Sequence, residues 1–217
     1  MVDKWIRKYM KMAKALADDN RSCYSRKIGC VLIDPDNCPI GFGYNGSIEG
    51  APHNDDERYL AHLWKNLLDD SQKEHLTKKF KLKPAELPNF IDSSRDYCDP
   101  IGEGFVAKFE GCKTCPRRLL DVPSGVGLEL CNCSHAERNA IFNAAKRGAS
   151  TKGATIYCWC GVPCHECSIA IIQSKIKRVV CLETGLPDYS KSSRGNFRFA
   201  GVELVIVNAD EVLADNA

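Results

Sequence analysis

The sequence predicts an α/β protein, a three-layer α-β-α domain with a mixed sheet of roughly five strands. Two observations carry this prediction. In the first part of the chain, two short apolar runs flank a tight-turn sequence, as in a β-hairpin. In the last part, short apolar runs alternate with stretches of helical periodicity, as in strands joined by helices. A hairpin followed by this alternation favours a mixed sheet that helices cover.

The first elements are a helix and the hairpin. Residues 3–18 place apolar side chains near i, i+4 and i+7 spacing, with basic residues between them, which indicates an amphipathic helix packed on a sheet. The apolar run 28–33 stops at an Asp-Pro-Asp-Asn turn, and 39–42 returns as its partner strand. A glycine-containing loop, 43–46, follows the hairpin.

The second half of the chain is predicted to alternate between helices and strands. Its elements are a helix at 136–147 that ends at Gly148, a strand at 154–159, a helix at 164–174, and strands at 178–182 and 203–207. The predicted order along the whole chain is therefore α-β-β-α-β-α-β-β.

The middle of the chain has a weaker pattern. Residues 56–69 look helical, but from about 70 to 97 lysine runs and prolines break any regular period. We interpret 70–97 as an inserted segment without a hydrophobic core of its own. Its lysines are predicted to form a solvated surface, in preference to a basic patch that binds phosphate. The chain is therefore predicted to be one domain, 1–217, with an insertion at about 56–111.

Charge and hydropathy argue against several classes of protein. With 30 Lys+Arg against 28 Asp+Glu, the net charge of +2 fits neither a general nucleic-acid binder nor an acidic tail. No apolar run reaches the ~18 residues that span a bilayer, and the first residues lack the apolar core of a secretory signal. A cytoplasmic location, the host cytoplasm if the protein is viral, is predicted.

Cysteine is unusually frequent, with 13 residues. In a secreted chain such a count would indicate disulfides, but here the number is odd, the spacings are short and no export signal is recognised. Metal ligation is therefore the better explanation for the excess.

Three ligands for a catalytic zinc ion stand out in the second half. His135 begins one predicted helix, Cys164 and Cys167 begin the next, and the strand between them brings both helix starts to one edge of the sheet. One imidazole and two thiolates leave a fourth position for water, and helix N-termini favour the thiolate form. Glu137, two residues after the histidine, is placed to move protons without being a ligand.

Each part of this pattern has a simpler explanation when it is taken alone. Ser134 and Glu137 fit a helix capping box, and Cys164 with Cys167 would also suit a redox pair or half of a structural zinc site. Together, however, the residues read His-x-Glu followed by Pro-Cys-x-x-Cys, the signature of zinc-dependent nucleobase deaminases. The predicted chemistry is attack of an activated water on the amine-bearing ring carbon.

The sequence resembles the deoxycytidylate (dCMP) deaminase family, within the cytidine-deaminase fold, over residues 5–53 and 112–207. The stretches that carry the resemblance are 23–29, 43–50, 122–125 with Cys131 and 135–141, and 163–172 with 176–180. The resemblance implies a cytidine-deaminase-like domain and a hydrolase of C–N bonds. Its reaction would convert dCMP and water to dUMP and ammonia, in the supply of thymidylate precursors.

The resemblance also implies roles for individual residues. The substrate contacts would be Ser25, Arg26 and Lys27 at the 5′-phosphate, Asn45 at the deoxyribose or base, and Ala136 and Tyr189. Tyr189 and Arg194 are assigned to a loop after the fourth strand, which would close over the substrate. Glu49 lies in the loop that would bind dCTP or dTTP as effectors, with Mg²⁺ on the nucleotide. Assembly into a homo-oligomer, a hexamer in the family, is implied as well.

The chain departs from the family in the segment before Cys164. The spacing from Tyr157 is one residue longer, and Trp159 and Cys160 replace smaller or hydroxyl-bearing residues beside the base pocket. Another cytosine substrate, such as dCTP, 5-substituted dCMP or a nucleic acid, therefore stays open, although the net charge disfavours a nucleic acid. A binding module that zinc stabilises, without catalysis, is a further alternative, but it leaves Glu137 unexplained.

A second, structural zinc site is predicted from the remaining cysteines. Cys112 and Cys115 are followed by Cys131 and Cys133, and close pairs of this kind are typical of a closed zinc site. The preferred ligand set is Cys98, Cys112, Cys115 and Cys131, while Cys133, His53 and, from the family resemblance, Cys23 compete for the fourth position. The cysteines within predicted strands, Cys30, Cys158 and Cys181, are assigned to the core.

Overall fold

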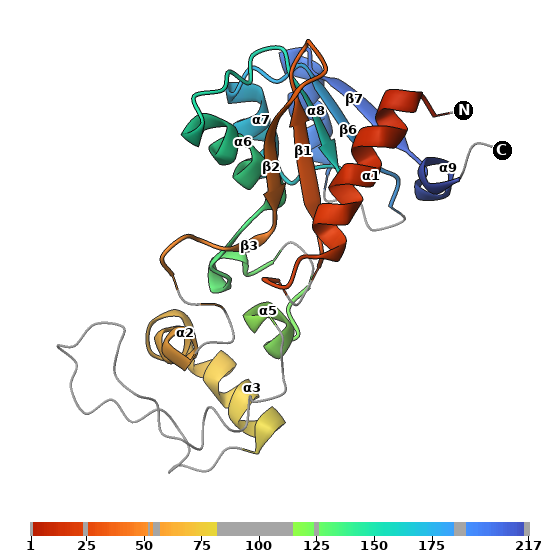
Figure 1. The fold of residues 1–217 in the computed structure, drawn as a ribbon. Coiled ribbons are helices and arrows are strands. Elements are labelled where there is room, and N and C mark those ends of the chain that lie inside the picture. The colour runs from red at the N-terminus through yellow and green to blue at the C-terminus, as the bar shows by residue number, and fades with distance from the viewer. Residues whose placement is uncertain are drawn as a thin grey trace. The chain divides into compact units, whose positions relative to one another are not determined.

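The computed structural model describes residues 2–23, 26–51, 53, 57–81, 115–123, 126–184 and 190–214. They belong to two compact units, and most of their helices and strands are labelled in Figure 1. The first unit comprises Met1–Arg21, Arg26–Gly46 and Ser134–Ala217, and the second comprises Ser22–Ser25 and Ser47–Cys133. The organisation as a single domain with an insertion at about 56–111 stays a prediction.

The first unit contains a mixed sheet of five strands, as the sequence predicts. In spatial order the strands are β2 (Pro39–Tyr44), β1 (Gly29–Ile33), β5 (Thr155–Cys158), β6 (Arg178–Leu182) and β7 (Glu203–Val207). Strand β1 pairs antiparallel with β2 and with β5, whereas β5, β6 and β7 run parallel. At the predicted turn of the hairpin, Asp34 Oδ1 accepts the backbone N–H groups of Asp36 and Cys38 at 2.9 and 2.8 Å.

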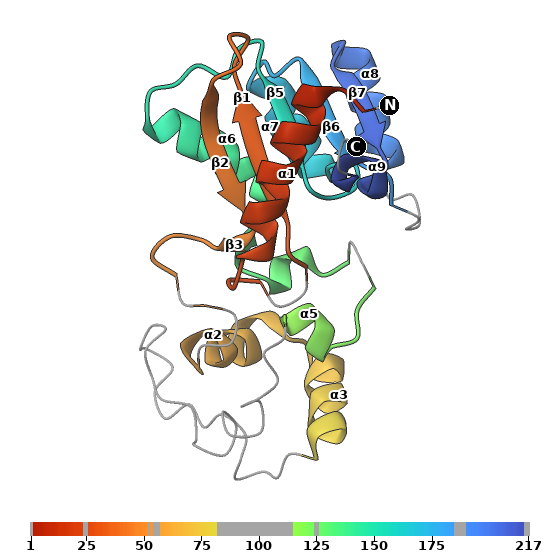
Figure 2. The ribbon, with the colours of Figure 1, turned by 45° about the vertical axis from the view of Figure 1, so that its right-hand side comes forward.

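Helices cover both faces of this sheet (Figures 1 and 2). One face packs against α1 (Lys4–Asp18) and α9 (Ala209–Leu213), and the other against α6 (Ala136–Lys146), α7 (His165–Gln173) and α8 (Lys191–Ala200). Because side chains alternate along a strand, Val31 and Val180 lie in the cluster with α1, while Leu32 and Val179 lie in the cluster with α6 and α7. The predicted three-layer α-β-α architecture is confirmed.

Helix α8 is absent from the sequence prediction, although it connects β6 to β7. Parallel neighbours need a crossover connection, and α8 supplies it. The segment has few apolar residues to mark it in the sequence: Ser193 and Phe197 are its buried residues, and Gly195 lies within it. Arg194 therefore lies on a helix and not in a loop, which corrects the prediction. Its Nε donates to Ser190 Oγ at 3.1 Å.

The second unit is helical and is built around a leucine-rich cluster. It includes α2 (Glu57–His62), a π-helical turn (Leu63–Leu67), α3 (Asp70–Phe80), α5 (Pro116–Leu119) and a 3-10 turn (Leu128–Leu130). The cluster packs residues from each of these elements, among them Leu60, Trp64, Leu76, Leu119 and Leu130. Two short strands, β3 (Gly46–Ser47) and β4 (Cys133–Ser134), pair with each other. None of the helices in the described ranges combines the length and apolar character that crossing a membrane requires.

Helix α3 lies in the segment where the sequence shows no regular period, and for 70–80 that prediction is wrong. A capping box starts the helix: Asp69 accepts the Gln72 N–H at 2.8 Å, and the Gln72 side chain accepts the Asp69 N–H at 3.0 Å. Leu76 is the buried residue of α3, so the apolar periodicity is too weak to show in the sequence. The rest of that segment, 82–97, lies outside the described residues.

Helix α6 approaches the hairpin closely because β2 carries a glycine at the contact. A Cβ atom at Gly43 would meet the carbonyl oxygen of Ala136 and the amide nitrogen of Ala140. Beside this contact, Asn139 of α6 donates its Nδ2 to the Tyr44 carbonyl of β2 at 2.8 Å. The glycine and the amide together fix the first turn of α6 against the end of β2.

We expect Gly43→Ala to lower the free energy of unfolding by about 1–3 kcal/mol, since the added methyl group overlaps backbone atoms that cannot turn aside. Gly195→Ala is the matched control. Its nearest neighbour would be Phe199 Cε2 at 3.8 Å, and alanine is favoured over glycine inside a helix by about 1 kcal/mol. Urea unfolding followed by circular dichroism measures both variants, and equal stabilities would contradict the packing argument.

Candidate metal centre

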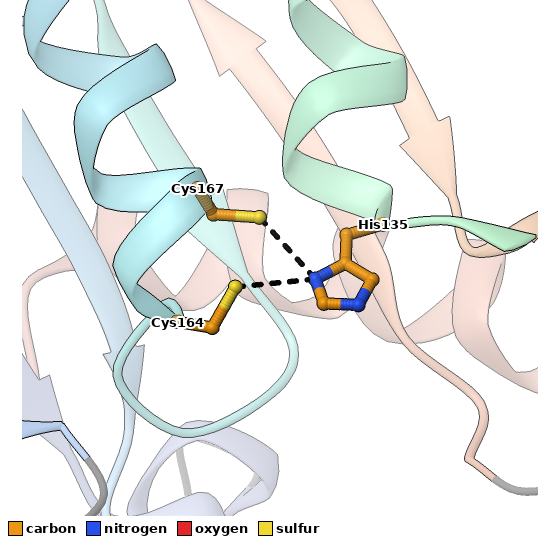
Figure 3. Close-up of side chains that lie close together, drawn as sticks. All are labelled: His135, Cys164 and Cys167. Atoms are coloured by element: carbon orange, nitrogen blue, oxygen red, sulfur yellow. Dashed lines mark hydrogen bonds between the residues drawn. The ribbon is translucent and has the colours of Figure 1, made fainter. Parts of the chain in front are cut away.

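Two helix N-termini of the first unit meet where α6 and α7 pack on the sheet (Figure 3). His135 is the N-cap residue of α6, and its carbonyl oxygen accepts the Asn139 N–H at 3.0 Å. Cys164 is the N-cap residue of α7, and its carbonyl accepts the Ser168 N–H at 2.8 Å. Cys167 follows in the first turn of α7. The side chains of the histidine and the two cysteines point toward one another.

These three side chains form a compact group of ligand atoms. The Nδ1 atom of His135 lies 3.3 Å from Cys164 Sγ and 3.4 Å from Cys167 Sγ. All three ligand atoms lie within 4.8 Å of one another. Cys167 is buried, whereas the other two residues are half-buried. One nitrogen and two sulfurs on a partly accessible site fit a catalytic zinc ion, which keeps a fourth position for water.

The thiols and the imidazole are electrostatically coupled. Hydrogen bonds with Cys167 and then with His135 lower the pKa of Cys164 to about 4, against the effect of burial. The hydrogen bond with Cys164 raises the pKa of His135. The hydrogen bond with Cys164, followed by burial, raises the pKa of Cys167. One thiolate is thus stable here by itself, and the second needs added positive charge, which a divalent cation supplies.

Glu137 lies in the first turn of α6, beside the ligand group. Its side chain is 3% exposed, and its Oε2 has no hydrogen-bond partner. Burial raises the pKa of this carboxyl group. The N-cap of α6 is His135, with no side-chain capping bond, so the capping-box interpretation of Glu137 is wrong. A buried carboxyl group with an unpaired oxygen is suited to accept and return a proton.

A row of thiols crosses the sheet on the α6 and α7 side. Cys30, Cys158 and Cys181 occupy paired positions on β1, β5 and β6 and are fully buried, which confirms their assignment to the core. Burial raises the pKa of Cys30 above its usual range and that of Cys181 to about 12. These thiols therefore stay protonated and unreactive. Cys160, just after β5, is half-buried, and its thiol contacts Cys158.

Asn45, a predicted substrate contact, is a buried amide that holds part of the first unit together. Its Oδ1 accepts the backbone N–H of Ile28 at 2.8 Å and the Nδ2 of Asn20 at 2.7 Å. Its Nδ2 donates to the Arg26 carbonyl at 2.8 Å, which leaves at most one N–H for a ligand. Asn20 is itself 3% exposed, and sequence reasoning missed it because its partner lies far along the chain.

The other predicted substrate contacts are described in part. Arg26 is half-buried, and the exposed Lys27 donates its Nζ to a backbone carbonyl at 3.0 Å. Ala136 is buried at the first position of α6. Ser25 and Tyr189 lie outside the described residues.

The second unit holds the residues predicted for the effector and for the structural zinc. Glu49 is exposed in the turn after β3. The thiols of Cys115 and Cys131 are in hydrogen-bond contact, so the structure brings together two of the predicted structural ligands. The other two, Cys98 and Cys112, lie outside the described residues.

Comparison with known proteins gives one family. The sequence model described as "Cytidine and deoxycytidylate deaminase zinc-binding region" matches residues 3–183. The chain is 45% identical over 73 residues to the deoxycytidylate deaminase of Enterobacteria phage T2, covering 32% of this chain and 36% of that protein. It is 28% identical over 177 residues to the deoxycytidylate deaminase of Schizosaccharomyces pombe, covering 81% of this chain and 36% of that protein. The chain thus spans about a third of the length of these curated relatives.

A solved structure shares the fold. The dCMP deaminase from the cyanophage S-TIM5 in apo form matches with a TM-score of 0.53 and 16% identity, covering 95% of this chain and 100% of that chain. The same deaminase in complex with dCMP and dUMP matches with a TM-score of 0.51 and 19% identity, with the same coverage. The cytidine-deaminase-like fold implied by the sequence is therefore confirmed.

The amide network at Asn45 makes a testable contribution to stability. Asn45→Ala leaves the Ile28 N–H and the Arg26 carbonyl without their partner, so we expect the free energy of unfolding to fall by about 1–3 kcal/mol. Asn66→Ala, at an exposed site, is the control and is expected to change it by less than about 0.5 kcal/mol. Chemical denaturation compares the two variants, and an Asn45→Ala protein as stable as the control would refute this role.

Proposed function

The chain belongs to the family described as cytidine and deoxycytidylate deaminase zinc-binding region, and from this premise we propose that it is a zinc-dependent deaminase of dCMP. The reaction is dCMP + H₂O → dUMP + NH₃, in the supply of thymidylate precursors. One observation carries the proposal: His135, Cys164 and Cys167 form an accessible ligand group beside the buried carboxyl group of Glu137. A binding module without catalysis has no use for that unpaired carboxyl oxygen.

The residues of the site have two roles, holding the ion and moving protons. His135, Cys164 and Cys167 would hold zinc, which when bound lowers the pKa of a water in its open position toward ~7. Glu137 accepts a proton as the water oxygen adds to C4 of the cytosine ring. It delivers that proton to N3, then takes the second proton from the hydroxyl added at C4 and passes it to the amine, which leaves as ammonia while the C4 carbonyl forms. Because burial raises its pKa, Glu137 holds the proton more readily between these steps.

The first unit also supplies contacts for the nucleotide. Gly43 of β2 contacts Ala136, so Asn45, just after β2, lies near the first turn of α6. A remaining Asn45 N–H would contact the sugar or base, and the Ala136 N–H, at a helix start, would contact the base. Arg26, whose carbonyl Asn45 binds, and Lys27 would supply positive charge for the 5′-phosphate.

A mononucleotide fits this chain better than a nucleic-acid strand. A strand needs a basic track with stacking aromatic residues, and a net charge of +2 with 8% aromatic residues indicates none. The relatives from phage T2 and from Schizosaccharomyces pombe are deoxycytidylate deaminases, which supports dCMP. Trp159 and Cys160, at the end of β5, make dCTP and 5-substituted dCMP the competing substrates to test.

Three further predictions concern the regulation, the assembly and the location of the protein. Binding of dCTP or dTTP with Mg²⁺ in the loop of Glu49 and assembly into a homo-oligomer follow from the family resemblance. A cytoplasmic location follows from the composition of the sequence. All three stay predictions.

A panel of cytosine compounds tests the substrate. We expect kcat/KM for dCMP to exceed that for deoxycytidine about tenfold or more, because each charge-assisted hydrogen bond to the phosphate contributes about 1.5–3 kcal/mol. dCTP, 5-substituted dCMP and a cytosine-bearing oligonucleotide complete the panel, and loss of cytosine absorbance measures turnover. Faster turnover of any of these would replace dCMP as the substrate, and no turnover of any mononucleotide would refute the proposal.

Replacement of the proposed proton carrier tests the mechanism. We expect Glu137→Gln to lower kcat for dCMP by about 10²–10⁴, since glutamine cannot accept the proton, while the zinc content of the centre is unchanged. Cys164→Ser is the comparison variant and is expected to lose both activity and that zinc. Metal analysis accompanies the kinetics, and a Glu137→Gln protein with wild-type turnover would show that another group moves the proton.

A further inference from the structure

Asn20 is a buried asparagine just after α1, and the proposed function gives it no role. Its backbone N–H donates to the Ala17 carbonyl at 3.1 Å, so the residue continues the end of the helix. Only 3% of Asn20 is exposed. Its Nδ2 donates to both oxygen atoms of Asn45, the backbone oxygen and Oδ1, at 2.7 Å each. One asparagine thus clamps another that lies 25 residues further along the chain.

The orientation of the Asn45 amide is fixed by backbone groups. Its Oδ1 accepts the backbone N–H of Ile28 at 2.8 Å, and its Nδ2 donates to the backbone carbonyl of Arg26 at 2.8 Å. Because a backbone N–H only donates and a carbonyl only accepts, turning the amide over would break both bonds. With the bond from Asn20, both lone pairs of Oδ1 are used. The group that Asn45 has left for a ligand is therefore its second N–H, a donor.

A glycine places the end of α1 close enough for this clamp. A Cβ atom at Gly29, the first residue of β1, would meet the carbonyl oxygen of Ala13 and the amide nitrogen of Ala17. Glycine therefore lets the last turns of α1 lie directly on the start of β1. Lys27 adds a second link, because its Nζ donates to the Asp18 carbonyl at 3.0 Å. The end of α1 thus holds the segment that leads into β1.

Asn45 is also fixed through the helix that begins at the metal centre. The backbone carbonyl of the preceding residue, Tyr44, accepts the Nδ2 of Asn139 at 2.8 Å. Asn139 belongs to α6, which carries Glu137 in its first turn and has His135 as its N-cap residue. Helices α1 and α6 cover opposite faces of the sheet (Figure 2). The end of β2 is therefore held from both faces, and its distance from the metal centre is set before any ligand binds.

We propose that Asn20 is a positioning residue for nucleotide binding, which holds Asn45 so that its second N–H is presented to an acceptor oxygen of the sugar or base. This role rests on the proposed function, in which Asn45 contacts the nucleotide. Asn20 acts through Asn45 and does not touch the nucleotide itself. A donor that is rigid before the ligand arrives lowers the cost of ordering on binding, so the end of α1 contributes to nucleotide affinity.

A purely structural role is the competing explanation for Asn20. Its loss leaves the buried backbone carbonyl of Asn45 without this donor, which lowers the stability of the fold. A structural role alone, however, does not predict weaker binding of a nucleotide to the folded protein. Measurement of nucleotide affinity and of stability in the same variants therefore separates the two explanations.

The first test is Asn20→Asp, which keeps the size of the side chain and replaces its two N–H donors with an acceptor oxygen. We expect the Kd for dUMP and the KM for dCMP to rise about tenfold, because the carboxylate repels the two oxygens of Asn45. We expect kcat to change by less than about twofold and the zinc content to stay the same, since no group at the reacting atoms is altered.

Asn143→Asp is the matched control for this test. Asn143 of α6 donates its Nδ2 to the Phe42 carbonyl at 2.8 Å, so the control loses a bond of the same kind and gains the same charge. It is expected to keep wild-type affinity for dUMP. Asn20→Ala adds no charge and is expected to weaken dUMP binding about threefold to fivefold, which keeps the test decisive if Asn20→Asp does not fold. Wild-type affinity in the folded Asn20 variants would overturn the proposal, whatever their stability.

A double-mutant cycle tests whether Asn20 acts through Asn45. Isothermal titration calorimetry measures dUMP binding in the wild type, in Asn20→Ala, in Asn45→Ala and in the double variant. We expect the Asn20 substitution to weaken binding in the wild-type background and to have no further effect in Asn45→Ala. Equal effects in the two backgrounds would show that Asn20 does not act through Asn45, and would refute the positioning role.

The same measurement separates this proposal from the proposed function. Calorimetry does not depend on turnover, so a wild type that binds dUMP without deaminating dCMP would refute the proposed function alone. A wild type that binds no dUMP would overturn both.

Discussion

The metal centre of the first unit depends on one constraint, the meeting of the first turns of α6 and α7 on the same face of the sheet. Helix α6 comes directly before β5 in the chain, and α7 comes directly after it. The two helices are therefore connected by one strand, β5, which is the central strand of the sheet. Gly43 permits the close approach of α6 to β2, and Asn139 bonds the two elements. Because ligand distances tolerate errors of only about 0.2 Å, this contact controls whether His135 and Cys164 reach the same ion.

The same arrangement concentrates groups that become negative in one buried place. The carboxyl group of Glu137 lies together with the thiols of Cys164 and Cys167. Burial by itself disfavours the charged form of each of these groups. The hydrogen bonds with Cys167 and His135 lower the pKa of Cys164, whereas the hydrogen bond with Cys164 and burial raise the pKa of Cys167. A divalent ion held by these residues would stabilise both thiolates, and Glu137 would then be the group able to exchange protons.

Sequence reasoning succeeded where the structure follows from local patterns. The strands β6 and β7 have the predicted bounds, because each is a short run rich in β-branched and apolar residues. The residues of the metal centre could be found because they form two close pairs in the sequence. His135 and Glu137 lie at the start of α6, and Cys164 and Cys167 lie at the start of α7. Helix α3 was missed because a helix with one buried residue, here Leu76, has no apolar period. Asn20 and Cys23 gain their partners only through tertiary structure, so no local pattern marks them.

The cysteines that prompted a metal-binding interpretation differ in their surroundings, and this difference separates their chemistry. Cys30 and Cys181 lie in an apolar core, where burial keeps the thiol protonated and no acceptor or cation is needed. Cys164 has an imidazole and a helix start beside it, which favour the thiolate and leave one side accessible for water.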